Sequence, residues 1–522
     1  MLRPFVLLLF LLSFMLISCD SGIQGSFSDN QPPTTSLTVE EINLPEGERL
    51  LSQVNISWWG DDPDGYVAGY EFYIGDVTQA TAEDWNFTEK TDSTFILPIP
   101  EGNTDADVEF TVRAVDNEEA RDPEPPSLTF PIRNTAPVIQ FTNNETPPDT
   151  TYRIVSFGFT PSDPDGDANL NRVEIALNDT TSADSWKELS VEANFITLRI
   201  DDTIDSPTAQ ILLGRSASES SMMFNTVNVN GDNEFHVRAI DNAGAVSDVK
   251  TYEWYVKEQT SNILFLNDYF GTNTDERGNF HLSLLEQVGI SEVDYMDISD
   301  GQVLGGTRVP LSSAFPDRSL ADPTINMMLA EWDYIYWISD DLDRNIGYAL
   351  ELTDEFFAQG GKMFINIPIE YLSDRNSLFQ FLPFREVAQE PSMPRRSPTF
   401  EIKRCSEIQS SDEISLDINL RLNRPIFPAN PIVPFNESIS LFRADFGLIL
   451  RNPTTRGDYE GIDLVSTMNP DQSIVYFGID LSNFTNVNDN PCEDPDTDEP
   501  LPPSDLEGLI EFLTIETLGF EQ

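Results

Sequence analysis

Two stretches of this chain repeat the same motifs in the same order. The first contains Asp62-Pro63-Asp64-Gly65 and later Val112-Arg113-Ala114, and the second contains Asp163-Pro164-Asp165-Gly166 and later Val237-Arg238-Ala239. The acidic turn motifs lie 101 residues apart (62 to 163), whereas the later motifs lie 125 apart (112 to 237). The second copy therefore holds about 24 additional residues, within 178–232. Such a repeat predicts two related domains in tandem.

Each copy has the pattern of short antiparallel strands. In the segment 109–115, Phe110, Val112 and Ala114 alternate with Thr111 and Arg113, which is the period of a strand with one buried face. The Asp-Pro-Asp-Gly blocks supply turn chemistry, because proline presets φ and glycine accepts a positive φ. Short strands at regular spacing, separated by such turns, predict an antiparallel β-sandwich for each copy.

The first copy resembles fibronectin type III and related immunoglobulin-like domains. The resemblance rests on a strand with Trp58, a Gly69-Tyr70 strand and the later Val-Arg-Ala-Val-Asp segment. The second copy has Phe159 in place of Trp58 and no aromatic residue in place of Tyr70. The resemblance covers about 210 residues and implies sandwiches at 48–134 and 135–258, but it is nearly silent on function.

The region 259–522 changes its period and predicts an α/β domain. A continuous apolar run at 262–266 is typical of a strand that is buried on both faces. Apolar residues at helical spacing follow it, and strands and helices then alternate, which predicts a parallel sheet with helices on both faces. A Pro-rich, β-structured insertion is expected at about 368–470. The expected strands are 262–266, 293–298, 333–338, 362–367 and 473–479, and the expected helices run through 280–288, 346–358 and 506–518.

This α/β region resembles flavodoxin-like and class I glutamine-amidotransferase-like domains. The resemblance rests on the segments WDYIYWISDD and LTDEFFAQGGKMFINI. In those amidotransferases a tight elbow with a catalytic cysteine follows the strand after the Gly-Gly pair. Here that stretch, 366–370, contains no Cys, Ser or Thr, and the only histidines of the chain are His236 and His281. The resemblance therefore implies the fold and argues against the activity.

The first residues have the layout of a secretory signal. Arg3 precedes an apolar run at 5–17, which is too short to span a bilayer comfortably, and Ser18 and Cys19 follow it. Leu-Ile-Ser-Cys resembles the lipobox of bacterial lipoproteins, which implies a signal peptide at 1–18 and acylation (palmitate) of Cys19. The polar run 19–47 then predicts a flexible tether. We expect an extracytoplasmic, lipid-anchored protein at the outer membrane or cell surface; the alternative is a Sec signal whose cysteine is incidental.

The formal net charge of −59, from 89 acidic and 30 basic residues, excludes nucleic acid as a partner. An acidic surface that keeps a secreted protein soluble, or adaptation to high salt, explains this excess of acidic residues.

Calcium is the one cofactor that the acidic loops suggest, because hard cations bind carboxylate and carbonyl oxygens. The residues that could converge in the two copies are Asp62, Asp64, Asp116, Asp163, Asp165, Asp167 and Asp241. The alternative is turn carboxylates that accept bonds from their own backbone.

Three further acids and two cysteines are candidates. Asp268 follows the first α/β strand and Asp340 and Asp341 follow the third, at the carboxyl edge where such sheets bind ligands. Cys405 and Cys492 remain once Cys19 is acylated, and outside the cytoplasm they could form a disulfide.

The sequence thus favours a non-enzymatic binding or scaffolding lipoprotein of the cell envelope, in which a sandwich stalk presents the α/β domain. Its expected partners are the membrane, through the lipid, and a protein or glycan of the envelope. Two alternatives stay open. One is an extracytoplasmic enzyme of the amidotransferase or flavodoxin-like class that uses carboxylates on glycan or peptide. The other is a subunit of an export or uptake assembly.

Overall fold

The structure is a computed structural model. It describes residues 29–39, 48–100, 102–269, 274–298, 303–304, 307–308, 315–342, 344–369, 378–388, 398–450, 456–485, 491–493, 497 and 499–521. The predicted signal peptide and the predicted lipidation site Cys19 lie outside the described residues, as does most of the predicted tether.

The chain divides into two compact units. The first comprises Met1–Ala136, Asp163–Asn169 and Asn242–Ala245, and the second comprises Pro137–Ser162, Leu170–Asp241 and Val246–Gln522. The second unit therefore holds both the strands of the second repeat and the α/β region.

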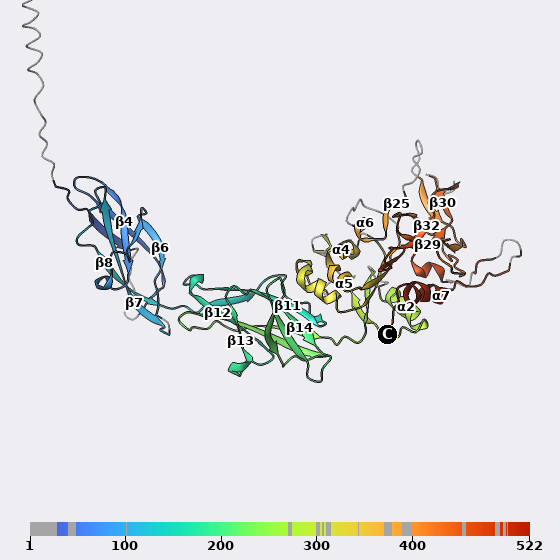
Figure 1. The fold of residues 1–522 in the computed structure, drawn as a ribbon, viewed down its shortest axis with the longest axis horizontal. Helices are drawn as coiled ribbons and strands as arrows, with labels where there is room; N and C mark the ends of the chain where they lie inside the picture. The colour runs from blue at the N-terminus through green and yellow to red at the C-terminus, as the bar shows by residue number, and fades with distance from the viewer. Residues whose placement is uncertain are drawn as a thin grey trace, which may run out of the picture. The chain divides into compact units, whose positions relative to one another are not determined.

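The first repeat is a β-sandwich (Figure 1). One sheet has the strand order β1-β3-β6, and the other has the order β2-β8-β7-β4-β5. Trp58 and Phe110 are buried between the sheets with their ring centres 6.0 Å apart, as the inward pattern predicts. The elements are β1 (Thr34–Val39), β2 (Leu50–Leu51), β3 (Gln53–Asp61), β4 (Val67–Ile74), η1 (Val77–Gln79), β5 (Asn86–Thr88), β6 (Asp92–Ile96), β7 (Asp105–Asp116) and β8 (Ser127–Arg133), and the short helix η2 (Asp167–Asn169) belongs to the same unit.

The second repeat is also a β-sandwich, with the sheet orders β10-β18-β17-β12-β13 and β16-β15-β14-β11-β9. Phe157 and Phe235 stack across its core at 4.1 Å, and Phe159 is fully buried in the place of Trp58. The elements are β9 (Val138–Phe141), β10 (Thr150–Thr151), β11 (Ile154–Ser162), β12 (Leu170–Leu177), η3 (Ala183–Ser185), β13 (Lys187–Ser190), β14 (Phe195–Asp201), β15 (Thr208–Leu213), β16 (Ser218–Phe224), β17 (Gly231–Asp241) and β18 (Lys250–Val256).

The additional residues of the second copy form a β-hairpin. In the first repeat, β6 is an edge strand and the chain passes from it to β7. In the second repeat, β15 and β16 are inserted between the corresponding strands, β14 and β17, and they extend the sheet. Both strands lie inside the range 178–232 in which the sequence placed the insertion.

An eight-stranded sheet of order β20-β19-β23-β24-β33-β32-β29-β27 forms the rest of the second unit. The first five are parallel, and numbered along the chain they run 2-1-3-4-5, a common order of doubly wound sheets. The sheet strands are β19 (Ile263–Asp268), β20 (Asp294–Asp297), β23 (Tyr334–Ser339), β24 (Lys362–Asn366), β27 (Ile408–Ser410), β29 (Ile439–Ala444), β32 (Leu464–Met468) and β33 (Ile474–Phe477). The other strands are β21 (Val303–Leu304), β22 (Thr307–Arg308), β25 (Phe384–Val387), β26 (Thr399–Ile402), β28 (Ile432–Pro434), β30 (Phe446–Ile449) and β31 (Arg456–Asp458).

Both faces of this sheet are buried. Ile263 and Phe265 of β19 belong to one hydrophobic cluster, whereas Leu264 and Leu266 belong to another. This explains the continuous apolar run, because a strand covered on both sides has no polar face. The helical elements are α2 (Thr274–Gln287), η4 (Arg318–Leu320), η5 (Ala321–Ile325), α3 (Asn326–Leu329), η6 (Asn345–Tyr348), α4 (Ala349–Leu352), α5 (Asp354–Ala358), α6 (Leu378–Phe381), η7 (Leu481–Phe484), α7 (Leu506–Ile510) and η8 (Glu511–Glu516).

One expectation for this region needs correction. The helix expected over 346–358 is three short pieces, because the chain leaves helical geometry at Thr353 and the amide of Asp354 bonds to Asn326 Oδ1 instead. The segment 368–470, expected as a Pro-rich and β-structured insertion, contains the strands β27, β29 and β32, which pair antiparallel and continue the main sheet.

Within the second unit, the sandwich packs directly on the α/β region. Tyr152 and Ile154 belong to one of the hydrophobic clusters of the eight-stranded sheet. The ring of Tyr152 meets that of Trp332 edge-on at 5.0 Å, and the hydroxyls of Ser156 and Thr324 are 2.6 Å apart in a buried position. The second sandwich is thus part of a shared core.

Candidate functional site

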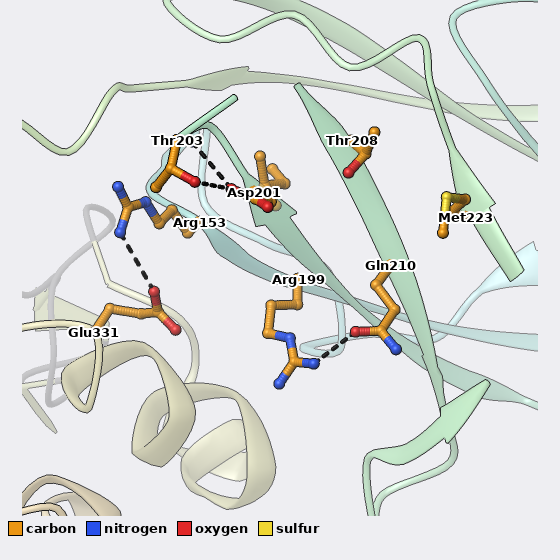
Figure 2. A pocket seen from close by; sticks show the side chains of 9 residues that line it. Arg153, Arg199, Asp201, Thr203, Thr208, Gln210, Met223 and Glu331 are labelled. Atoms are coloured by element: carbon orange, nitrogen blue, oxygen red, sulfur yellow. Dashed lines mark hydrogen bonds and ion pairs between the residues drawn. The ribbon is translucent and has the colours of Figure 1, made fainter. Parts of the chain in front are cut away.

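The inserted hairpin contributes to a groove in the second unit (Figure 2). The groove has a volume of about 490 Å³, which lies within the range of about 300–1,000 Å³ that is usual for small-molecule sites. Its lining comes from both parts of the unit: Arg153, Arg199, Ile200, Asp201, Thr203, Thr208, Gln210 and Met223 belong to the sandwich, and Glu331 follows α3.

The floor of the groove is a row of side chains across three neighbouring strands. Arg199 of β14 pairs with Gln210 of β15, and Gln210 pairs with Met223 of β16. Residues that are opposite each other on paired strands project from the same face. The Nη2 of Arg199 donates to Gln210 Oε1 at 2.6 Å and to Glu219 at 3.2 Å, and Met223 is 47% exposed. The row thus offers a guanidinium, an amide and an apolar side chain side by side.

The wall of the groove is a charged cluster around Arg153. Its guanidinium lies 2.6 Å from Asp202 and 3.6 Å from Glu331, toward which it points in Figure 2. Burial raises the pKa of the Glu331 carboxyl, and the nearby Arg153 opposes this shift. The Nε of Arg153 is buried and has no hydrogen-bond partner among the residues that the structure describes.

A second hollow of about 480 Å³ shares Arg153 and Glu331 with this groove. Its other lining residues belong to the segment that enters β19 and to the turn before β20. They are Gln259, Thr260, Ser261, Asn262 and Glu292. The Arg153–Glu331 ion pair therefore borders two hollows.

The three acids expected at the carboxyl edge of the sheet, Asp268, Asp340 and Asp341, lie at that edge. Asp268 and Ser339 end adjacent strands and pair in register. Asp268 is fully buried and accepts bonds from the backbone and side-chain amides of Asn345, at 3.0 and 2.7 Å. Asp340 accepts two bonds of 3.0 Å from Arg344. The backbone carbonyl of Asp341 accepts a bond from Ser339.

The sequence did not single out a buried polar cluster at the same edge. His281 of α2 is fully buried, its Nδ1 lies 3.0 Å from the hydroxyl of Tyr336, and burial lowers its pKa to about 4. Arg277 of the same helix lies 3.7 Å from Asp480, which follows β33. Burial, and then Asp480, raise the pKa of Tyr269. No local motif joins these residues, because they come from four separate segments.

The acidic loop residues act mainly as acceptors for backbone amides. In the first unit, Asp116 accepts from the amides of Glu118 and Ala120, both at 2.8 Å, and Asp64 accepts from Gln31 at 3.2 Å. The Oδ1 of Asp62 accepts a long bond of 3.4 Å from the Asp64 amide.

The turn of the second copy shows the same chemistry. Asp163 accepts from the amide of Asp165 at 2.8 Å, and Asp167 accepts from that of Asp163 at 3.0 Å. Asp165 is fully buried and accepts from Ser52 and Thr135, and Asp241 is buried. Across the described residues, no three His, Cys, Asp or Glu side chains are grouped to hold a metal ion. The calcium site stays a prediction.

The structure joins Cys405 and Cys492 in a disulfide, with the Cα atoms 5.5 Å apart and a sequence separation of 87. In the described part of the chain, no helix has both the length and the apolar character needed to cross a bilayer.

No family model matches the chain, and no curated protein does. Solved structures do match. The fibronectin(III)-like modules of Clostridium thermocellum CbhA are 16% identical, with a TM-score of 0.16, over 43% of this chain and 95% of theirs. The FN1–FN3 domains of chicken CNTN1 are 13% identical, with a TM-score of 0.19, over 44% and 68%. A two-domain fibronectin type III segment of chicken tenascin is 8% identical, with a TM-score of 0.18, over 44% and 99%.

Proposed function

We propose that this chain is a bacterial envelope lipoprotein that binds a component of the envelope without transforming it. The signal layout and Cys19 support the anchor, since several acyl chains, at roughly 0.8 kcal/mol per buried methylene, hold a large domain on a membrane durably. The first sandwich serves as a spacer, and the second unit carries the binding site.

The observation that carries this proposal is the Arg199–Gln210–Met223 row. The second repeat differs from the first by a hairpin, and this hairpin contributes Gln210 and Met223 to a groove that Arg153 and Glu331 border on the other side. A spacer domain needs no such extension. Extra strands that build a concave surface next to another domain are what a binding module requires.

The five parallel strands in the order 2-1-3-4-5 support a flavodoxin-like class for the α/β region. An enzyme of the amidotransferase-like class has less support, because its partner histidine would have to be accessible. His281 is fully buried against Tyr336, and His236 lies in the sandwich strand β17.

Two measurements on the full-length chain in bacterial cells test the proposal. Metabolic labelling with an alkyne fatty acid should tag the wild type and leave Cys19→Ser untagged and released from membranes.

A photo-crosslinking residue at Met223 should capture an envelope component, whereas one at Val138, which is 53% exposed on β9 of the same sandwich, should not. Equal labelling of both chains contradicts the anchor, and equal capture at both positions contradicts the groove. A single protein captured only at Met223 would instead favour a subunit of an export or uptake assembly.

A further inference from the structure

The groove of Figure 2 is lined by charges of both signs. Its lining includes Arg153, Arg199, Asp201 and Glu331, and two more acids, Asp202 and Glu219, form ion pairs with the arginines. A charged ligand of either sign would therefore meet like charges at close range. With the chain at −59 overall, polyanions are repelled at long range as well.

Some hydrogen-bonding groups of these charged side chains remain available to a ligand. Both bonds of the Arg199 guanidinium use Nη2, which leaves Nε and Nη1 on a side chain that is 42% exposed. The buried Nε of Arg153 lacks an acceptor among the described residues. The Glu331 carboxylate, 27% exposed, lies 3.6 Å from the Arg153 guanidinium and can accept further bonds. The groove thus presents donors and acceptors a short distance apart.

We propose that this groove binds an uncharged oligosaccharide, an inference that rests on the binding function proposed above and names its ligand class. Each sugar hydroxyl both donates and accepts, so it can satisfy a guanidinium and a carboxylate together. Planar polar side chains such as Arg199 and Gln210 can engage two adjacent hydroxyls at once. Met223, which is 47% exposed, supplies apolar surface for the C–H face of a ring.

The open form of the ligand site also fits a polymer. The hairpin edge strand β16 forms one boundary of the sheet, so the row of Arg199, Gln210 and Met223 runs out to that edge. A chain of sugar units can lie across such a row.

Isothermal titration of the full-length chain in detergent micelles tests this inference. The uncharged probes are maltohexaose, cellohexaose and chitohexaose, and the charged comparisons are hexagalacturonate and spermine. We expect at least one uncharged probe to bind and both charged ones to bind about tenfold more weakly or not at all. Arg199→Ala and Gln210→Ala should each weaken binding by about tenfold, the usual effect of losing a hydrogen bond that involves a charged or buried partner.

Arg443→Ala is the matched control, because Arg443 is 43% exposed and pairs with Asp463 at 2.8 Å, away from the groove lining. It should leave the affinity unchanged, and thermal denaturation of all three variants confirms that they fold. Tighter binding of hexagalacturonate or spermine, equal losses in Arg199→Ala and Arg443→Ala, or no binding by any uncharged probe would each overturn the inference. Selective crosslinking at Met223 to another class of molecule would then leave the groove function standing and refute only the ligand class.

Discussion

The guanidinium of Arg238 lies 3.9 Å from the centre of the Trp186 ring. The first copy repeats the arrangement, with Arg113 at 3.8 Å from the ring of Trp85. In each copy the same arginine also forms an ion pair with a glutamate on the neighbouring strand, which is Glu174 at 2.6 Å or Glu71 at 2.7 Å. The central arginine of the Val-Arg-Ala motif is therefore held between an aromatic face and a carboxylate in both sandwiches.

Replacing Arg238 with alanine should destabilise the second unit by about 1–3 kcal/mol. The change removes a cation–π contact and leaves the largely buried Glu174 with fewer partners. Calorimetry of the full chain should show a lower transition temperature, with Arg238→Lys in between because lysine keeps the charge but not the planar stack. Arg443→Ala, which removes an exposed ion pair, should shift the transition by less than about 1 kcal/mol. Equal shifts in the two alanine variants would refute the role of the stack.

The buried His281 should make folding sensitive to mild acid. Burial depresses its pKa from the ordinary value of 6.5 to about 4, so between these pH values the unfolded chain takes up a proton that the folded chain does not. Stability is then fully present above pH 6.5 and is lost as the pH falls toward about 4, by at most about 3 kcal/mol from this group.

The measurement is urea unfolding at several pH values for the wild type and His281→Gln. The difference between the two curves isolates this histidine from the many carboxylates. His236→Gln is the control, because Glu234 opposes the lowering of the His236 pKa by burial, and it should retain most of the acid sensitivity. A wild-type curve that runs parallel to that of His281→Gln from pH 7 to 4 would contradict the prediction.

Reduction of the Cys405–Cys492 disulfide should lower stability strongly. The bond closes a loop that spans 87 residues, for which chain entropy gives about 4–5 kcal/mol. Adding a reductant should therefore lower the thermal transition of the wild type and should not affect a variant with serine at both positions. If the wild type is insensitive to reductant while free thiols become detectable, the loop closure contributes little.

We predict that the packing of the second sandwich against the α/β region depends on Tyr152. It is 3% exposed and packs edge-on against Trp332, so Tyr152→Ala removes a large aromatic group from a shared core at a cost of about 3–5 kcal/mol. We expect increased amide hydrogen exchange on both sides of the contact, in β11 and around Trp332. Tyr66→Ala, at a tyrosine that is 67% exposed, is the matched control and should change exchange only locally. Unchanged protection around Trp332 in Tyr152→Ala would show that the packing does not depend on this ring.

Local patterns predicted the strands well. The alternation around Phe110 reflects burial on one face of the strand, and the continuous apolar run of β19 reflects burial on both faces. Both patterns can be recognised from consecutive residues alone. The insertion could be located because the two copies provide a comparison within one chain.

Neither the groove nor the break in the helix expected over 346–358 could be predicted from the sequence, because each depends on residues that are far apart in the chain. Arg153 and Glu331 are 178 residues apart, and no period links them (331 against 153). The end of α4 depends on Asn326, a residue of another helix. The tryptophans Trp85 and Trp186 were a missed signal, since each lies 23 residues after the first aspartate of the Asp-Pro-Asp-Gly motif of its copy (62 to 85 and 163 to 186).

The first repeat lacks the inserted hairpin, so it shows how the second repeat could be engineered without it. The first repeat already terminates its sheet at β6, the counterpart of β14, so it supplies a natural short template for the second. Grafting the direct β6-to-β7 connection between β14 and β17 should yield a trimmed domain that retains its sandwich and loses Gln210 and Met223 together. Because the second repeat gained this surface through an inserted hairpin and not through changes in its core, removing the hairpin should remove the surface and leave the core intact.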